Sequence, residues 1–342
     1  MYQLKRHGGP ILTPDKDLAW EREGVFNPGI IKREEDIVML YRAIGERNNY
    51  ISRIGLATST DGVSFKRGAV EPVIGPSEIY DKWATEDPRI TAIDGEYFIT
   101  YVGVPDPIME NGQPIVRSLP LETSSALLKT SDFVTFEKLG IISPSGSDNK
   151  DVVLFPEKIN GRFAMLHRPT RWAKSWFNGS FDKFVDEGLP CPVSELPDIP
   201  GIWIAFSDNL TNWNDHRLVM KPTHHLDAKI GAGLPPIKTS EGWLLIYHHV
   251  DQGTEPNTFR YSVRAAMLDL NEPSKFISKI PYDILAPEEP YEKESSSGIV
   301  FPSGGYVEGD MLKVYYGASD NSVCLATGSL RELILELKHF TI

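Results

Sequence analysis

Basic side chains recur at matching positions in five similar segments of this 342-residue chain. The residues near the end of each segment are Arg42, Val102, Arg168, His248 and Tyr316. The chain carries 35 Lys and Arg against 47 Asp and Glu, so two arginines and a histidine at equivalent places are unusual. A salt bridge to a nearby carboxylate would explain any one of them. As a set, they indicate a site for an anion or for sugar hydroxyl groups.

Two adjacent carboxylates precede the second segment. Glu86 and Asp87 lie in the stretch 84–90, and Pro88 follows Asp87 directly. A residue before proline favours an extended backbone, which would fix the direction of the Asp87 carboxylate. A carboxylate held beside another can have a raised pKa and act as a general acid. Because Asp-Pro alone more often marks a turn, Asp87 is a candidate acid only.

A glycine-rich stretch at 229–236 begins with Lys229. It lacks the GxxxxGK[ST] spacing of a Walker loop. Glycines allow close approach of the backbone, so a lysine beside them can reach an anion. His224 and His225 are adjacent and would face opposite sides of a strand, which does not suit a shared metal ion. We therefore expect an anion contact from Lys229 and no metal site.

The five segments that carry these residues are typical of β-strands, because each is short, rich in β-branched and aromatic residues, and preceded by a turn. They span 36–43, 95–103, 161–169, 242–250 and 310–318. Each is followed by a second strand-like run, and the unit recurs about every 60 to 80 residues. The first three second runs end in a Ser/Thr-Asp turn, and the fourth repeat, which replaces this turn, is the weakest match.

This repetition predicts an all-β fold, a single five-bladed β-propeller catalytic domain over residues 1–342. In a propeller, equivalent strand ends converge on one shallow pocket, which would bring the basic residues together. A β-sandwich with coincidental similarity between segments is the alternative.

Composition limits the partners of the protein. A net charge of −12 argues against nucleic acid and against an anionic membrane surface. The N-terminus has no signal-peptide pattern, and no apolar run is long enough to span a bilayer, so we expect a cytoplasmic protein. Cys191 and Cys324 are far apart and are expected to be free thiols. The sequence is compatible with a homo-oligomer.

Nine short motifs, taken together and in order, resemble glycoside hydrolase family 130, the β-mannoside phosphorylases and related mannosidases. They are FNPG at 26–29, YRA at 41–43, SRIGLATSTDG at 52–62, EDPRI at 86–90, LFPEKING at 154–161, LHRP at 166–169, KIGAGLPPI at 229–237, GWLLIYHH at 242–249 and YYGASD at 315–320. The resemblance implies a five-bladed propeller and an inverting reaction. In that reaction inorganic phosphate, a co-substrate, cleaves a β-mannoside to α-mannose 1-phosphate without a cofactor.

The resemblance also implies roles for single residues. Asp87 matches the family's proton donor, which is thought to act through a sugar hydroxyl. The positions that bind the transferred mannose are matched by Asn27, Arg42, Arg53 and Asp320. The positions that hold phosphate are matched by Arg168, Lys229 and His248. Arg47 is an alternative to Arg53, and His167 or Arg171 an alternative to Arg168.

The basic trio favours phosphorolysis, because an inverting hydrolase needs a second carboxylate to activate water, whereas a phosphorylase needs cations to hold phosphate. We expect β-1,4-linked mannosyl-glucose or mannooligosaccharides as substrates, with the linkage and the acceptor sugar open. A β-1,2-mannoside phosphorylase, an exo-acting β-mannosidase and a non-catalytic sugar-binding propeller are the alternatives. An arabinan- or fructan-cleaving propeller fits less well, because Asn27 stands where an early catalytic Asp is needed. Trp172, Trp176 and Phe177 are candidates for stacking on the acceptor sugar.

Overall fold

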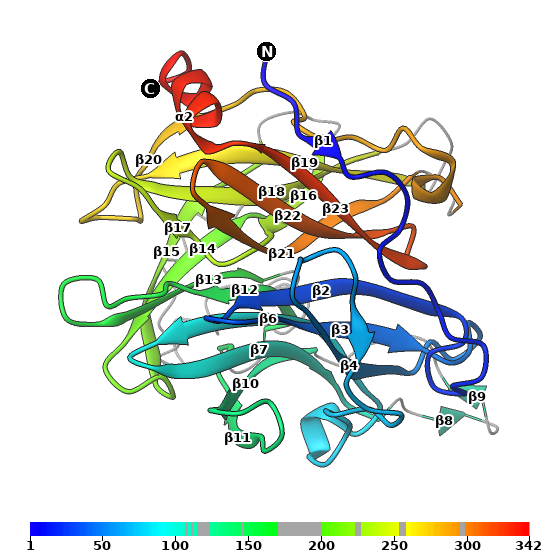
Figure 1. The fold of residues 1–342 in the computed structure, drawn as a ribbon. Helices are drawn as coiled ribbons and strands as arrows, with labels where there is room; N and C mark the ends of the chain where they lie inside the picture. The colour runs from blue at the N-terminus through cyan, green and yellow to red at the C-terminus, as the bar shows by residue number, and fades with distance from the viewer. Residues whose placement is uncertain are drawn as a thin grey trace.

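Five antiparallel sheets make up the computed structural model of the protein, and they are arranged as the blades of a propeller (Figure 1). The model describes residues 1–106, 109–110, 113–114, 123–144, 147–169, 200–222, 227–252, 258–294 and 298–341. The five-bladed β-propeller predicted from the repeats is confirmed, and the β-sandwich is excluded. No helix in these ranges is long and apolar enough to cross a membrane.

In each blade the first strand lies nearest the centre of the propeller, and the following strands lie progressively further out. Blade 1 contains β2 (Gly24–Lys32), β3 (Ile37–Ile44), β4 (Ser52–Ser59) and β5 (Lys66–Arg67). Blade 2 contains β6 (Ala84–Ile93), β7 (Glu96–Val104), β10 (Ser124–Thr130) and β11 (Glu137–Ile141). Blade 3 contains β12 (Asn149–Leu154), β13 (Phe163–Pro169), β14 (Ile202–Ser207) and β15 (Trp213–Met220).

Blade 4 contains β16 (Asp227–Ala232), β18 (Trp243–Gln252), β19 (Phe259–Leu268) and β20 (Phe276–Lys279), with the short β17 (Ile237–Lys238) beside β18. Blade 5 contains β21 (Val300–Glu308), β22 (Met311–Ala318), β23 (Ser322–Ser329) and β1 (Lys5–Arg6). The remaining elements are the hairpin β8 (Met109–Glu110) and β9 (Gln113–Pro114), the 3-10 turns η1 (Ile79–Asp81) and η3 (Pro290–Glu292), and α2 (Leu330–Lys338). The five repeat segments found in the sequence are the second strands β3, β7, β13, β18 and β22.

The N-terminal strand closes the ring, because β1 pairs with β23 and becomes the outer strand of a blade built from the C-terminal residues (Figure 1). Arg6 anchors this closure by donating from Nε to Glu292 Oε1 at 2.9 Å. Glu292 is fully buried and also accepts from the Tyr316 hydroxyl at 2.8 Å. The two ends of the chain are therefore held in one blade by a buried ion pair as well as by strand pairing.

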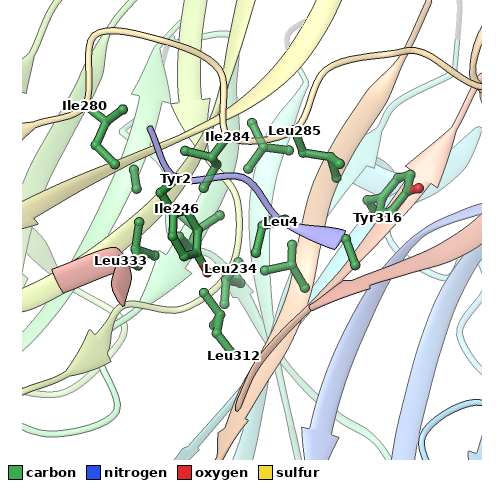
Figure 2. Close-up of a cluster of buried hydrophobic side chains, with 14 of the residues drawn as sticks. Tyr2, Leu4, Leu234, Ile246, Ile280, Ile284, Leu285, Leu312, Tyr316 and Leu333 are labelled. Atoms are coloured by element: carbon green, nitrogen blue, oxygen red, sulfur yellow. The ribbon is translucent and has the colours of Figure 1, made fainter. Parts of the chain in front are cut away.

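Hydrophobic side chains fill the five spaces between neighbouring blades, and each space holds a separate cluster. Alternate residues of a strand face opposite blades, since the side-chain period of a strand is two. In β3, Val38 and Leu40 pack towards blade 2, whereas Met39 and Tyr41 pack towards blade 5. Figure 2 shows the cluster between blades 4 and 5, which contains Ile246 of β18 and Leu312 of β22. The second strands read as continuous apolar runs because both faces are covered.

The turn after the third strand is the same in four blades. Its side-chain oxygen accepts two backbone N–H groups and comes from Asp61, Asp132, Asn209 and Asp269. In the fourth repeat, Asp269 accepts from the backbone of Asn271 at 2.9 Å and of Glu272 at 2.8 Å. That repeat therefore keeps the geometry of the turn, although its sequence departs from the Ser/Thr-Asp pattern.

Candidate active site

Three inner strands carry a β-bulge at equivalent positions, and each bulge holds a polar residue. The pairing of β2, β6 and β12 with the neighbouring strand slips once in each blade. The residues inside the slips are Asn27, Asp87 and Asp151, with φ of 46°, 50° and 57°. A left-handed backbone is unfavourable for residues with a Cβ, although Asn and Asp tolerate it best. Backbone outliers of this kind concentrate at functional sites.

The extended backbone expected for Asp87 is wrong, because the bulge places this residue in the left-handed region. Its carboxylate meets blade 1: Oδ1 accepts from Asn27 Nδ2 at 2.8 Å and from Arg42 Nη1 at 3.1 Å. Only 7% of Asp87 is exposed. We call Asn27, Arg42, Glu86 and Asp87 the acid cluster.

The charges around Asp87 decide its protonation in the empty site. Burial raises the pKa of Asp87, but Arg42, Arg89, Lys150 and the hydrogen bond from Asn27 outweigh it, so the pKa lies below its usual range. The raised value expected from the neighbouring carboxylate is therefore wrong here. Glu86 does not act as an unpaired charge, because it accepts from Arg42 Nη2 at 2.7 Å and from Lys150 Nζ at 3.2 Å.

Arg42 is held from several sides. Its Nε donates to Ser52 Oγ at 2.8 Å, and its two terminal nitrogens are bound to Glu86 and Asp87. The guanidinium also lies over the rings of Phe26 and Tyr50, at 5.0 and 5.3 Å from their centroids. This enclosure explains why the residue can remain buried as a cation.

A second carboxylate, Asp320, has a raised pKa, in contrast to Asp87. It accepts a hydrogen bond from the Tyr50 hydroxyl at 2.9 Å. Burial and the nearby charges of Asp87 and Glu86 raise the pKa of Asp320, despite Arg42 and the Tyr50 hydrogen bond. Asp320 and Asp87 thus differ in their affinity for protons, and carboxylates with separated pKa values commonly take different roles in one site.

Basic residues gather around Asp151. Its Oδ2 accepts from Arg168 Nε at 2.5 Å, and His248 Nε2 lies 3.5 Å from the same oxygen. Lys229 lies on β16 opposite Val250 of β18, two residues along the strand from His248, with its Nζ 5.4 Å from the centre of the Tyr261 ring. We call Arg168, Lys229, His248 and Asp151 the cation cluster. It unites the three basic residues that the sequence assigned to phosphate.

His248 is neutral in this surrounding. Its ring stacks on Phe301 with centroids 4.7 Å apart, and the residue is completely buried. Burial is the largest cause that lowers the pKa of His248 to about 3, and Arg168, Lys229 and Arg89 add to it against the carboxylate of Asp151. Within the described residues, neither ring nitrogen makes a hydrogen bond. A neutral imidazole with two unused nitrogens can donate to or accept from a ligand.

Arg89 connects the two clusters and was not singled out by the sequence. It is 1% exposed and donates from Nη1 to the backbone carbonyl of Asp87 at 3.0 Å. Its Nη2 donates to Asp151 Oδ1 at 3.2 Å, and its Nε to the carbonyl of Gly233 at 2.8 Å. The one guanidinium therefore contacts three blades.

Asp151 was also missed, although a signal for it exists in the sequence. The stretches Phe26-Asn27-Pro28, Glu86-Asp87-Pro88 and Lys150-Asp151-Val152 occupy the same place in three successive inner strands. Aligning the first strands of the repeats, rather than the second strands, would have placed Asp151 beside Asn27 and Asp87.

The structure does not bring Arg53 into either cluster. Its Nη1 donates to the carbonyls of Ser52 and Trp83 at 2.8 and 2.9 Å. Its side chain lines a separate hollow of about 450 Å³ together with Trp20 and Glu46. Neighbouring residues on a strand point to opposite faces, and Ser52, next to Arg53, faces Arg42.

The residues named as alternatives to Arg53 and Arg168 do not join either cluster within the part of the chain that the structure describes. Arg47 is on the surface and donates to the carbonyl of Glu23 at 2.8 Å. His167 is buried within blade 3, where its Nε2 lies 3.1 Å from Nδ1 of His216. Some residues considered in the sequence lie outside the residues that the structure describes: Arg171, Trp172, Trp176, Phe177, Cys191, His224 and His225. Cys324 is a buried free cysteine.

The fold and the site define a five-bladed propeller in which a buried acid cluster and a cation cluster meet at the inner strands. The model of glycoside hydrolase family 130, described as β-1,4-mannooligosaccharide phosphorylase, matches residues 13–339. The chain belongs to this family of enzymes.

Relatives with known activities show how broad the family is. A 1,2-β-oligomannan phosphorylase of Thermoanaerobacter sp. (strain X514) is 36% identical over 342 residues, covering 97% of this chain and 99% of the relative. The β-1,4-mannooligosaccharide phosphorylase of Ruminococcus albus is 27% identical and covers 95% and 88%. Among solved structures, a β-1,2-mannobiose phosphorylase of Listeria innocua in complex with β-1,2-mannobiose is similar with a TM-score of 0.76. It is 28% identical and covers 98% of this chain and 99% of that one.

Proposed function

We propose that this enzyme cleaves β-1,2-linked mannosides with inorganic phosphate and releases α-mannose 1-phosphate. The observation that carries this proposal is the cation cluster beside the acid cluster. Arg168, Lys229 and His248 supply charge and hydrogen-bonding groups for a phosphate, and Asp87 supplies a carboxylate within the same network. Phosphate is already an anionic nucleophile, so the reaction needs one acid and no base.

The names of the relatives support the proposed linkage. The sequence led us to expect β-1,4-linked substrates, and the family model carries a β-1,4 description. The relative with 36% identity and the solved structure with 28% identity are both named for β-1,2-linked substrates, whereas the β-1,4-specific relative is 27% identical. A family description averages over many members, so we give more weight to the individual relatives and favour the β-1,2 linkage.

In the proposed reaction a phosphate oxygen attacks the anomeric carbon on the face opposite the leaving group. The bond from that carbon to the glycosidic oxygen breaks, and its electron pair stays on the oxygen, which takes up a proton that Asp87 supplies through a sugar hydroxyl group. Asn27 and Arg42 orient the carboxylate of Asp87, and Asp320 with Tyr50 is assigned to sugar hydroxyl groups. Inversion follows from the single displacement.

Asp87 must hold a proton to act as this acid, although the surrounding cations favour its charged form. A phosphate bound at the cation cluster would offset the charges of Arg89 and Arg168. The pKa of Asp87 would then rise towards the working pH, as a nearby negative charge disfavours a second one. In this scheme phosphate binding prepares the acid as well as supplying the nucleophile.

An exo-acting β-mannosidase is the second candidate. An inverting hydrolase requires a carboxylate base for water. Asp151 is the carboxylate of the cation cluster, but Arg89 and Arg168 occupy its two oxygens and hold its pKa below the usual range. A carboxylate engaged in this way is a weak base, which favours phosphate as the nucleophile.

The linkage is tested with β-1,2-mannobiose and β-1,4-mannobiose at equal concentration and saturating phosphate. We expect kcat/KM for the β-1,2 disaccharide to exceed that for the β-1,4 disaccharide by at least about a hundredfold, because a site built to hydrogen-bond a substrate hydroxyl rejects a substrate that lacks it there. Equal values, or a preference for the β-1,4 disaccharide, would contradict the proposed linkage without affecting phosphorolysis itself.

A further inference from the structure

A carboxylate occupies the middle of the site that we assign to phosphate. Asp151 is 1% exposed, and both of its oxygens are engaged: Oδ1 by Arg89 Nη2 at 3.2 Å and Oδ2 by Arg168 Nε at 2.5 Å. A fixed negative charge opposes the binding of an anion, and a buried charge is costly unless it is paired. Its presence therefore calls for a compensating role.

The geometry of Arg168 indicates what that role is. Asp151 binds it through Nε, the nitrogen at the inner edge of the guanidinium, and not through the terminal nitrogens. A planar guanidinium held at Nε has a fixed plane, so the direction of its other donors is also fixed. The same carboxylate oxygen lies 3.5 Å from Nε2 of His248, without a hydrogen bond, so this one carboxylate contacts two of the three residues that we assign to phosphate.

The chain preserves space for this arrangement. A Cβ at Gly231 would lie 2.3 Å from Asp151 Oδ2 and 2.4 Å from Cε1 of His248. Contacts this short are not accommodated without movement, so only glycine permits the carboxylate and the imidazole to approach each other here. The strained φ of 57° at Asp151 brings its side chain to the same point.

Arg89 extends the arrangement to the acid. Its Nη1 and Nη2 donate to the Asp87 carbonyl and to the Asp151 carboxylate, so a single rigid group spans the backbone of the acid and the anchor of the cation cluster. Its guanidinium also lies 5.6 Å from the centre of the Phe301 ring, against which His248 stacks. The two clusters are thus joined by one chain of contacts.

We propose that Asp151 is a positioning residue of the phosphate site: it orients Arg168 beside His248 and, through Arg89, sets the place of this arginine relative to Asp87. This inference rests on the proposed phosphorolysis. A buried ion pair that only stabilises the fold would not act selectively on phosphate, and a simple repulsive charge would weaken phosphate binding in the native enzyme.

Asp151→Asn separates these roles, because it keeps the shape of the side chain and removes its charge. We expect the KM for phosphate to rise by at least about tenfold, since the loss of one partner of a buried charged pair disturbs the other. The KM for the mannoside should stay within about twofold. Phosphate alone, without sugar, should raise the Tm of the native enzyme and should raise that of the variant much less.

Glu21→Gln is the matched control. Glu21 is fully buried and accepts from Arg67 Nε at 2.5 Å, the same contact that Asp151 makes with Arg168, but in the outer part of blade 1. Its loss should lower the Tm and leave both KM values unchanged. If Asp151→Asn behaves like this control, raises both KM values equally, or lowers the KM for phosphate, the positioning role is contradicted.

Gly231→Ala keeps the inference testable if Asp151→Asn does not fold. The added methyl group displaces the carboxylate and His248 without changing any charge, and it should also raise the KM for phosphate selectively. An unchanged KM for phosphate in this variant would contradict the positioning role. If the native enzyme turns over without phosphate and phosphate does not change its Tm, the proposed function fails. If the native enzyme responds to phosphate and the variants show no selective effect, only this inference fails.

Discussion

The Nη1 atom of Arg42 lies 3.1 Å from Oδ1 of Asp87, on the oxygen that also accepts from Asn27. Two residues of blade 1 therefore hold a carboxylate of blade 2 across the boundary between the blades. The contact depends on the register of β3, in which Arg42 shares a face with Val38 and Leu40 and so points towards blade 2. The carboxylate of Asp87 is therefore oriented by contacts across the boundary between two blades.

Replacing Asp87 by Asn tests the acid directly. Asn tolerates the left-handed backbone and keeps the hydrogen bond geometry, but it has no proton to give. We expect kcat for phosphorolysis of a natural disaccharide to fall by about a hundredfold or more, the usual scale of general acid catalysis. The loss should be smaller when β-mannosyl fluoride replaces the disaccharide as the donor, because fluoride needs little protonation to leave. Near-normal phosphorolysis of the disaccharide would show that Asp87 is not the acid.

Glu86→Gln provides the comparison for that variant. Glu86 is bound to Arg42 and Lys150, so its charge affects the site only through these partners. We expect a smaller loss of kcat than for Asp87→Asn, and the same loss with the fluoride donor as with the disaccharide. If the fluoride donor restored the activity of Glu86→Gln, Glu86 would be the proton donor and our assignment of Asp87 would be wrong.

Lys229→Ala tests the phosphate site. Lys229 is partly exposed and lies near His248, whose pKa its charge helps to lower. Its removal should raise the KM for phosphate by about tenfold or more, as the loss of a charged contact to an anion does, and change the KM for the mannoside little. Initial rates measured over a grid of both substrate concentrations separate the two constants. Equal effects on both would mean that the lysine serves the sugar or the fold.

Asp320→Asn should have the reverse selectivity. Asp320 contacts Tyr50 and lies near Arg42, and in the proposed division of the site it binds the sugar. Loss of a hydrogen-bonding carboxylate should raise the KM for the mannoside by about tenfold while the KM for phosphate stays constant. Tyr50→Phe, which removes one donor to Asp320, should have a smaller effect of the same kind. A phosphate-selective effect in either variant would contradict the division of the site.

Buried histidines make stability depend on pH. Burial lowers the pKa of His248 to about 3 and of His216 to about 4, against about 6.5 in the unfolded chain. The unfolded state therefore takes up protons first as the pH falls below 6.5. The free energy of unfolding is not reduced by these histidines above this pH. It should decline towards pH 4, by up to about 1.4 kcal/mol per pH unit for each histidine.

Urea unfolding measured between pH 7 and pH 5 checks this decline. His216→Asn removes one of the groups and should make the decline less steep. The stabilisation from Asp151, whose pKa is lowered, is fully present above about pH 4 and is lost only below that pH, as the carboxylate protonates. A free energy of unfolding that is constant from pH 7 to pH 5 would contradict the neutral, buried state of these histidines.

The repeats were sufficient to predict the fold, because second strands covered on both faces give long apolar runs that are easy to align. Arg42, Arg168 and His248 could be found for the same reason, since they occupy one position in that alignment. The structure brings Arg168 and His248 together around Asp151 and places Arg42 in the acid cluster. The direction of a side chain follows from its strand position once the blade order is known.

The bulges of the inner strands explain why part of the site could not be predicted from the sequence. A bulge shifts the register by a residue and turns the backbone left-handed, so Asp87 could not be placed from the extended pattern that proline favours. Arg89 and Asp151 depend on contacts between three blades, and no local pattern encodes such contacts. Arg53 was assigned by resemblance alone, and its hydrogen bond to the Trp83 carbonyl leads it away from the clusters.

The requirement for phosphate is the most direct test of the account. The enzyme is incubated with β-1,2-mannobiose with and without inorganic phosphate, and the sugar products are followed by ³¹P and ¹H NMR, which also report the anomer. We predict equal amounts of α-mannose 1-phosphate and mannose with phosphate, and no turnover without it. Release of free mannose alone, at a rate that does not depend on phosphate, would contradict phosphorolysis and indicate a hydrolase.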